Sequence, residues 1–337
     1  GETIQMLKGH TSAVNSIAWD SSDTRLATGS SDNTTRVWDV ATGETVQMLK
    51  GHTSAVNSIA WDSSGTRLAT GSSDNTIRVW DVTTGETIQM LKGHTSAVNS
   101  IAWDSSDTRL ATGSSDKVIR MWDSQTGEPI LTLIGHTDSV TSLAWSPDGS
   151  RLVTGSEDTT VRIWDTNARQ SLNTIQQGHT ESIKDLKRSP NSKFMLSASD
   201  DFTFKLWDIE NIATLSSFVG NKVLTNRVAW SPDSKLFISA SDDGTLSIWD
   251  VNTGNVIQTL NGHTSRVMDV DWSSNGRFVV SVSLDNTVQI WDVNEGNCLH
   301  KVMLDAGIRT CTWASNDEFI ILGDNMGRVI WLNWKIR

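Results

Sequence analysis

The stretch GHTSAVNSIAWDSSGTRLATGSSDNTIRVWD, residues 51–81, decides the fold, because near-copies of it precede and follow it in the chain. Residues 9–50 and 51–92 differ only at the paired positions Asp23/Gly65, Thr35/Ile77, Ala41/Thr83 and Val46/Ile88. Self-similarity at a fixed period is typical of repeat proteins, in which each repeat is one structural unit. A chain of 337 residues would otherwise suggest several domains. The repeats instead predict one array over residues 1–337.

The composition limits the partners that the chain is suited to bind. Its 28 Lys and Arg residues against 39 Asp and Glu residues give a formal net charge of -11. This charge opposes the binding of nucleic acid or of an anionic membrane surface, which favour basic proteins. We therefore expect a protein or peptide partner that is basic or neutral, and no nucleic-acid or membrane partner.

Cysteine usage and hydropathy give further limits. Cys298 and Cys311 are the only cysteines, too few for a disulfide framework or a thiolate metal cage. No apolar run approaches the ~20 residues of a membrane-spanning helix. We expect a cytoplasmic, monomeric protein with no metal site and no cofactor.

Tryptophan marks the repeat. The chain holds 16 Trp and no Tyr, which implies a structural position that is filled again and again. Trp-Asp dipeptides recur at a period of about 42 residues, and the last period ends on Trp-Leu. The eight repeats end near Asp39, Asp81, Asp123, Asp165, Asp208, Asp250, Asp292 and Leu332.

Each period contains four short strand-like segments. Segments such as AVNSIAW, RLATGS, TIRVWDV and ETIQMLK are short and β-branched, and turn residues such as SDN and TTG separate them. Apolar or small residues occupy both side-chain parities, as with Val14 and Ala18 on one side and Ile17 and Trp19 on the other. This pattern indicates sheets that are covered on both faces. Four-stranded sheets stacked around an axis satisfy it.

A period of this length, with Gly-His near its start and Trp-Asp near its end, resembles the WD-repeat β-propeller family. The resemblance implies an all-β, eight-bladed β-propeller of four-stranded antiparallel sheets. Seven blades with the last repeat as a tail are the alternative. The chain begins with GETIQMLK, which matches the fourth strand at residues 85–92, and it stops on a third strand. The first residues should therefore complete the last blade and close the ring.

The resemblance also implies a buried chain of hydrogen bonds in each blade, made by the His of Gly-His, a hydroxyl on the second strand, a turn Asp and the Trp of Trp-Asp. The sets are His10, Thr28, Asp32 and Trp38; His52, Thr70, Asp74 and Trp80; His94, Thr112, Asp116 and Trp122; His136, Thr154, Asp158 and Trp164; His179, Ser197, Asp201 and Trp207; and His263, Ser281, Asp285 and Trp291.

Thr70, His52 and Asp74 could instead be interpreted as a nucleophile, base and orienter. The sixfold recurrence argues against this, because an enzyme of this size rarely needs six identical sites. A buried polar network needs no further purpose than to be satisfied, since an orphaned member costs ~1–3 kcal/mol. Eight-bladed quinone-cofactor dehydrogenases resemble the chain in blade number alone. We therefore predict no catalytic residue and no enzyme activity.

Two repeats depart from the pattern. Asn221 takes the His position of the sixth repeat, and the eighth has Leu304, Ile321 and Asn325 in the His, hydroxyl and Asp positions. Blades six and eight are thus predicted to be the least braced.

The resemblance implies that three positions per blade point toward the face where partners bind. In blades one to three these positions are small, neutral and nearly identical. In later blades they are varied, and Arg, Met and Leu are suited to interface cores. We predict partner contacts in blades five to eight, with a solvated rim as the alternative. The candidates are Glu157, Lys184, Asp200, Asn226, Asp242, Arg266, Met268, Leu284, Arg309 and Asp324.

Three functions follow as hypotheses. The chain begins in mid-pattern, and its last segment, GDNMGRVIWLNWKIR, resembles the terminal blade of propellers attached to NACHT and NB-ARC signalling NTPases. The first hypothesis is therefore a recognition or sensor propeller excised from a larger signalling protein. A free-standing scaffold or adaptor is the second. An engineered or recently duplicated repeat protein without a specific ligand is the third.

Overall fold

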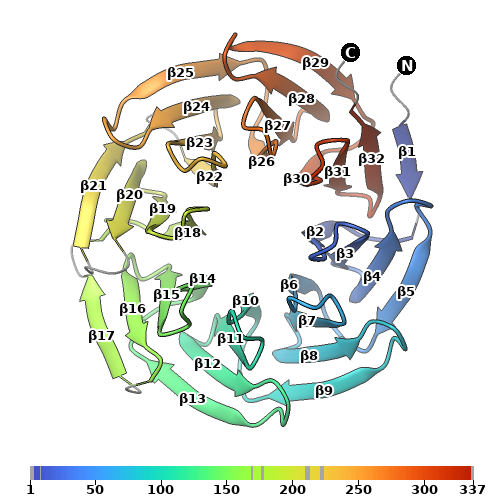
Figure 1. Cartoon of the computed structure of the whole chain (residues 1–337), viewed down its shortest axis with the longest axis vertical. Coiled ribbons are helices and arrows are strands. Elements are labelled where there is room, and N and C mark those ends of the chain that lie inside the picture. Colours follow the sequence, from blue (N-terminus) through green and yellow to red (C-terminus); the bar gives the residue numbers. More distant parts are fainter. Residues whose placement is uncertain are drawn as a thin grey trace. The chain divides into compact units, whose positions relative to one another are not determined.

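A computed structural model describes residues 4–7, 9–167, 170–175, 178–208, 213–220 and 224–334. These residues form 32 strands, and no helix is present among them. The strands make eight four-stranded sheets, each with its strands in antiparallel order. The predicted all-β fold of an eight-bladed β-propeller is confirmed, and the seven-bladed alternative is wrong (Figure 1).

The first four blades are formed by consecutive strands. They are β2 (Val14–Trp19), β3 (Arg25–Ser30), β4 (Thr34–Asp39) and β5 (Thr45–Lys50); β6 (Val56–Trp61), β7 (Arg67–Ser72), β8 (Thr76–Asp81) and β9 (Thr87–Lys92); β10 (Val98–Trp103), β11 (Arg109–Ser114), β12 (Val118–Asp123) and β13 (Pro129–Ile134); and β14 (Val140–Trp145), β15 (Arg151–Ser156), β16 (Val161–Asp165) and β17 (Gln170–Ile175).

The last four blades follow the same order, except that the eighth takes its fourth strand from the start of the chain. They are β18 (Ile183–Arg188), β19 (Phe194–Ser199), β20 (Thr203–Asp208) and β21 (Ala213–Val219); β22 (Thr225–Trp230), β23 (Leu236–Ser241), β24 (Thr245–Asp250) and β25 (Val256–Asn261); β26 (Val267–Trp272), β27 (Phe278–Ser283), β28 (Thr287–Asp292) and β29 (Asn297–Met303); and β30 (Ile308–Trp313), β31 (Phe319–Asp324), β32 (Val329–Asn333) and β1 (Ile4–Leu7).

The turn between the second and third strands sets the register of each blade. In blade two the Asn75 N–H donates to the Ser72 carbonyl at 3.2 Å, and Asn75 has a φ of 69°. Asn reaches this left-handed region at low cost. Phe202 takes the same place in blade five with a φ of 65°, so this turn keeps its shape even where the residue is unfavourable.

The described residues group into two compact units, residues 15–186 and residues 1–14 with 187–337. In each unit the hydrophobic cores form between successive blades. One cluster in the first unit joins Ala69 and Val79 of blade two to Ile101 and Trp122 of blade three. A cluster in the second unit joins Phe278 of blade seven to residues of blade eight. A single repeat therefore cannot bury its own apolar faces.

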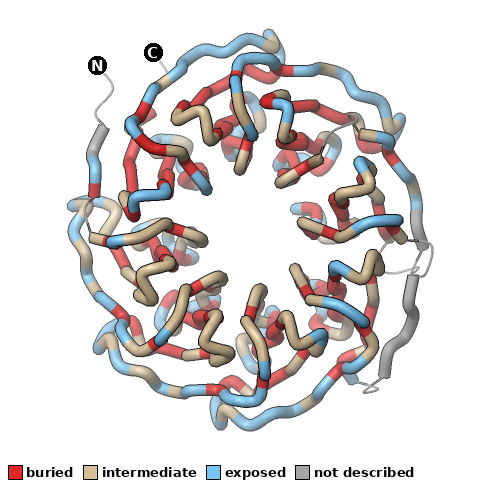
Figure 2. Tube along the Cα trace, turned by 180° about the vertical axis from the view of Figure 1, so that it is seen from behind, coloured by how far each residue is buried: buried red, intermediate tan, exposed pale blue. Residues whose placement is uncertain are grey.

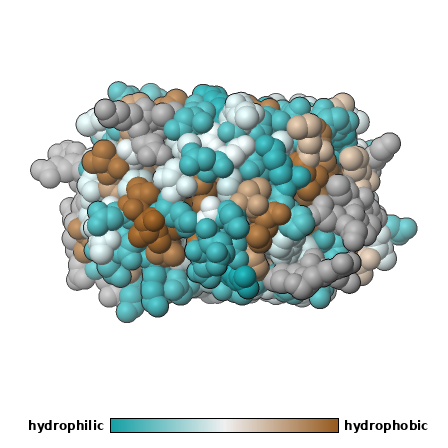
Figure 3. Space-filling view, turned by 90° about the horizontal axis from the view of Figure 1, so that it is seen from above, coloured by the Kyte–Doolittle hydropathy of each residue, from teal (hydrophilic) through white to brown (hydrophobic). Residues whose placement is uncertain are grey.

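Burial decreases from the inner strands of a blade to its fourth strand. Figure 2 shows the fourth strands β5, β9, β13, β25 and β29 as largely exposed. On β5 and β9 the exposed side chains include Val46, Met48, Ile88 and Met90. Figure 3, which looks at the molecule from the side of β25 and β29, likewise shows hydrophobic groups among hydrophilic ones. These side chains alternate with polar ones along each strand, as expected of a sheet edge that faces water.

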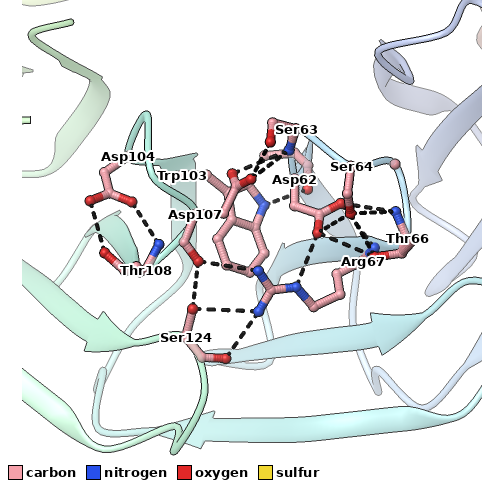
Figure 4. A network of polar contacts seen from close by, with 12 residues as sticks. Asp62, Ser63, Ser64, Thr66, Arg67, Trp103, Asp104, Asp107, Thr108 and Ser124 are labelled. Atoms are coloured by element: carbon pink, nitrogen blue, oxygen red, sulfur yellow. Dashed lines mark hydrogen bonds and ion pairs between the residues drawn. The ribbon is translucent and has the colours of Figure 1, made fainter. Parts of the chain in front are cut away.

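Arg67, the first residue of β7, joins blade two to blade three (Figure 4). The Arg67 Nε is 3.1 Å from the Asp62 carboxylate of its own blade, and its Nη2 donates to the Asp107 carbonyl of the next blade at 3.1 Å. Its guanidinium also lies 4.8 Å from the centre of the Trp103 ring. Charge-assisted hydrogen bonds and cation–π contact act together here.

The strand β1 completes the eighth blade, as the sequence predicts. It pairs antiparallel with β32, and Met6 and Leu7 lie opposite Ile330 and Val329. The Leu7 side chain is buried, whereas Met6 is 43% exposed. Closure of the ring by this strand stays a prediction.

Deleting residues 1–8 should destabilise the protein far more than an ordinary terminal truncation. The deletion exposes the edge of β32 and removes the buried Leu7 side chain, whose burial alone contributes ~2 kcal/mol. We expect the melting temperature to fall by about 5 °C or more. Met6→Ala is the control and should leave it nearly unchanged. An unchanged melting temperature after the deletion would contradict the role given to β1.

Candidate functional site

The His–hydroxyl–Asp–Trp set of blade two forms one continuous chain of hydrogen bonds. The His52 Nδ1 lies 2.8 Å from the Asp74 carboxylate, and its Nε2 lies 2.8 Å from the Thr70 hydroxyl. The Trp80 indole N–H donates to the same hydroxyl oxygen at 2.8 Å. Because the carboxylate requires an N–H at Nδ1, the neutral ring accepts at Nε2 and Thr70 donates to it. The chain of donors therefore runs from Trp80 to Thr70, then to His52, and ends on Asp74.

This arrangement has the same sequence of hydrogen-bonded groups as a hydrolytic triad, but its hydroxyl is not accessible to a substrate. Thr70 is fully buried, and its oxygen already accepts the indole N–H of Trp80. A nucleophile needs a free path to a substrate and an oxygen that is not occupied by another donor. The geometry supports bracing of the blade by the set, not attack on a substrate.

The same contacts recur in other blades. The hydroxyl accepts the indole N–H at 2.8–3.0 Å in blades one to seven, at Thr28, Thr70, Thr112, Thr154, Ser197, Ser239 and Ser281. Contacts of His to both the hydroxyl and the Asp occur in the sets of His94, His136 and His263. His10 and His179 are buried in their own sets, and Asp32, Asp201 and Asp243 each accept a Thr hydroxyl in the turn.

Blades six and eight depart from this pattern where the sequence does. Asn221, in the His position of blade six, lies outside the described residues. In blade eight Leu304 and Ile321 are buried apolar residues, and Asn325 contacts the Arg309 Nε. Weaker bracing of these blades stays a prediction.

Burial controls the charges in the sets. It lowers the pKa of His52 below its usual value, although the Asp74 carboxylate opposes the shift. Burial alone would raise the pKa of Asp74, but hydrogen bonds from Thr76, Thr53 and His52 outweigh it and lower this pKa to about 2. The set thus holds a neutral imidazole against a carboxylate at neutral pH.

In blades one to three, part of the predicted contact face instead braces the blades. The Asn57 amide donates to the Ser73 hydroxyl at 3.0 Å and to the Val98 carbonyl of the next blade at 3.1 Å. Asn15 and Asn99 make the same pair of contacts. The polar uniformity of these blades therefore has a structural cause.

The structure brings several of the predicted contact residues of blades six to eight together. Arg266 forms an ion pair with Asp242, and its side chain is 52% exposed. Asn226 donates to Asp242 at 2.7 Å and to the Val267 carbonyl at 2.8 Å, so it joins blades six and seven. Gly307 lies against Leu284, which places the turns of blades seven and eight next to each other.

The remaining predicted contact residues differ in solvent exposure. Glu157 and Arg309 are exposed, while Lys184, Asp200 and Met268 are half-buried. Glu157 and Lys184 belong to the unit of residues 15–186, and the other candidates belong to the second unit.

The prediction that Asp324 contacts a partner is wrong. It is fully buried, it accepts the Nε of Arg328 at 2.5 Å and it also accepts the backbone N–H groups of Met326 and Arg328. Its carboxylate holds this turn together and is not available to a partner. Met326, two residues later, is 58% exposed.

Sequence reasoning missed Asp269 and Asp271 on β26. Their carboxylates accept hydrogen bonds from blade eight, whereas Ser58 and Ala60 occupy the equivalent positions in blade two. A comparison of the third and fifth positions of each first strand would have found these two acidic residues.

Two protein-family models each match more than half of the chain. The model for the first β-propeller of IFT122 matches residues 119–335, and the model for the first β-propeller of WDR19 matches residues 15–198. The chain belongs to the WD-repeat-like β-propeller family. β-Propellers of this type are generally non-catalytic.

The WD-repeat-like propeller is also similar to a designed protein. It shares 27% sequence identity with the crystal structure of the computationally designed Ika8 protein, with a TM-score of 0.86 and 98% of each chain covered. No curated protein matches the propeller. None of the segments that the structure describes is a helix with the length and hydrophobicity to span a lipid bilayer.

Acid should destabilise the WD-repeat-like propeller through the buried histidines with lowered pKa values, which are His52, His94, His136 and His263. The pKa of His52 is lower in the folded chain than in the unfolded chain, so the unfolded state takes up more protons as the pH falls below about 6.5. The free energy of unfolding should therefore fall with the pH in this window, by at most about 1.4 kcal/mol per pH unit for each histidine.

The measurement is denaturant unfolding at several pH values for the wild type and for His52→Gln. The variant should lose part of the pH dependence, because glutamine does not titrate. Asp271 has a raised pKa and contributes with the opposite sign, so the comparison uses the difference between the two proteins. Identical pH dependence in both would contradict a neutral, buried His52.

Proposed function

We propose that the chain is a non-catalytic protein–protein interaction domain that binds a partner through the contact surface of blades six to eight. We define this surface as Asp242, Arg266, Met268, Leu284, Arg309 and Met326. The observation that carries the proposal is in blade seven, where Met268 and Leu284 occupy the positions of the hydrogen-bonded Asn57 and Ser73 of blade two.

Replacement of a polar pair by an apolar pair at the surface exposes apolar side chains to water. A bound partner would cover them and so remove this unfavourable exposure. Met268 and Leu284 are both half-buried and both leave part of their apolar surface in water. Burying such groups contributes ~25 cal/mol per Å². The exposed Arg266, Arg309 and Met326 of the same surface are residue types that are enriched at interface cores.

The net charge of the chain suits a basic or neutral partner. On the contact surface Arg266 pairs with Asp242, so that pair carries no net charge, whereas Arg309 contacts the neutral Asn325 amide and keeps its positive charge. The net charge of -11 disfavours a strongly acidic partner in addition. We propose a protein or peptide that presents an apolar side chain to Met268 and Leu284.

The setting of this domain is a second part of the proposal. The similarity of residues 323–337 to the terminal blade of propellers in NACHT and NB-ARC proteins supports a sensor domain of a larger, cytoplasmic signalling protein. A free-standing scaffold would use the same surface. The near-identity of residues 9–50 and 51–92 favours the other candidate, an engineered or recently duplicated repeat protein without a specific ligand.

Affinity capture with a matched pair of variants tests the contact surface. The test variant combines Arg266→Ala, Met268→Ala and Arg309→Ala. The control combines Thr53→Ala and Thr95→Ala, which are exposed residues of blades two and three. Captured proteins are compared by mass spectrometry after both variants are shown to have the wild-type melting temperature.

We expect at least one protein that the wild type and the control retain and the test variant loses at least about tenfold, because an interface hot spot contributes ~2 kcal/mol or more. Equal capture by all three proteins would overturn the proposed surface. A wild type that captures nothing above background would support the repeat protein without a ligand.

A further inference from the structure

Several successive blades are joined at their first strands by neutral hydrogen bonds. Between blades two and three, the Asn57 amide donates to the Val98 carbonyl at 3.1 Å, and the Trp103 indole N–H donates back to the Ala60 carbonyl at 3.0 Å. The junction of blades six and seven has the same two contacts, made by Asn226 and Trp272. None of these groups titrates near neutral pH, so these junctions are insensitive to it.

The junction of blades seven and eight has neither contact. Met268 stands where the asparagine amide is needed, and the buried indole N–H of Trp313 has no acceptor among the described residues. This junction therefore lacks both neutral hydrogen bonds that join blade two to blade three.

Two carboxylates of β26 hold this junction instead. Asp269 accepts the Thr310 hydroxyl at 2.8 Å and the Cys311 N–H at 3.1 Å. Asp271 accepts the Thr312 hydroxyl at 3.1 Å and the Trp313 N–H at 2.9 Å. The two aspartates are two residues apart on one strand, so both carboxylates point to the same side of it, toward β30.

The charged groups around the pair do not neutralise both carboxylates. Arg227 on β22 and Lys187 on β18 lower the pKa of Asp269, but burial outweighs them and raises it. Burial and the charge of Asp269 raise the pKa of Asp271 to about 6. Burial and the two aspartates raise the pKa of the Cys311 thiol on β30, so this thiol stays neutral.

We propose that the junction of β26 and β30 is a pH-responsive joint, which is tight while one carboxylate of the Asp269–Asp271 pair is protonated and loosens when both are charged. A protonated carboxyl group still accepts a backbone N–H through one oxygen, whereas two partly buried charges side by side repel each other. The folded pKa of Asp271 is above its unfolded value of 3.8. Its contribution to stability is therefore complete below that value and is lost as the pH rises through about 6.

Hydrogen exchange at the Cys311 and Trp313 amides measures the joint directly. We expect their protection factors to fall between about pH 5 and about pH 7.5, by up to about tenfold, because pH 5 lies about one unit below the folded pKa of about 6 and each unit is a factor of ten. The control amides are Ile101 and Trp103, on the strand of blade three that faces Ser58 and Ala60. His52, His94, His136 and His263 cannot mimic this result, because their lowered pKa values make them stabilise the protein as the pH rises.

Two variants separate charge from packing. Asp271→Asn keeps a hydrogen-bond acceptor without a titrating group, so it should abolish the pH dependence at Cys311 and Trp313. Asp269→Ser combined with Asp271→Ala installs the residues of blade two and should do the same if the single variant folds poorly. Asp243→Asn, an exposed carboxylate of blade six, should leave the dependence unchanged. Protection that rises with pH in the wild type, or a pH dependence that persists in both variants, would overturn the proposal.

Discussion

The Thr70 hydroxyl lies where the second strand, the third strand and the Gly-His segment of a blade meet, and it joins them because its oxygen and its proton are both used. The Trp80 indole on β8 donates to it, and it donates to His52, which in turn is held by Asp74 in the turn. Each neutral bond contributes only ~1 kcal/mol, but a missing member would leave a buried polar group unpaired at ~1–3 kcal/mol. Loss of the imidazole therefore favours an apolar residue in place of its hydroxyl partner. Blade eight illustrates this, with apolar Leu304 and Ile321 in the place of the imidazole and hydroxyl, whereas blade six keeps the bond between Trp249 and Ser239 without a histidine in its sequence.

Bracing within a blade positions the groups that join it to the next one. The hydrophobic clusters span two blades, and the Arg67 guanidinium and the Asn57 amide both reach from blade two into blade three. The side chains of these contacts stand at repeat positions that other blades fill with the same or with different residues. A change in one copy consequently acts at one junction. Blade seven shows this, since Met268, Asp269 and Asp271 on β26 alter both an exposed surface and the junction directly beside it.

Spacing in the sequence was sufficient to predict the fold. The recurrence of Trp-Asp sets the blade count, and the match of the first residues to residues 85–92 predicts that β1 completes the last blade. The contact candidates could be predicted only in part, because a position in the repeat does not determine what a side chain contacts. Asp324 aligns with Ser73 at the face, yet Arg328 binds it in the interior. Asn226 and Asp242 similarly contact each other, because their positions are neighbours in space. The sequence shows no motif at Asp269 and Asp271, since their partners include Thr hydroxyls and backbone N–H groups of another blade.

The strand β1, which completes the eighth blade, has the same four-residue sequence as part of another strand of the chain. The sequence of β1, IQML, occurs again as residues 88–91 within β9. The pairing of β1 with β32 is therefore selected by covalent attachment, which keeps its effective concentration high, more than by the chemistry of its side chains. The same β32 edge would accept the corresponding segment of a second molecule in the same register. At high concentration this feature provides a route to strand exchange, by which monomers become linked through their last blades.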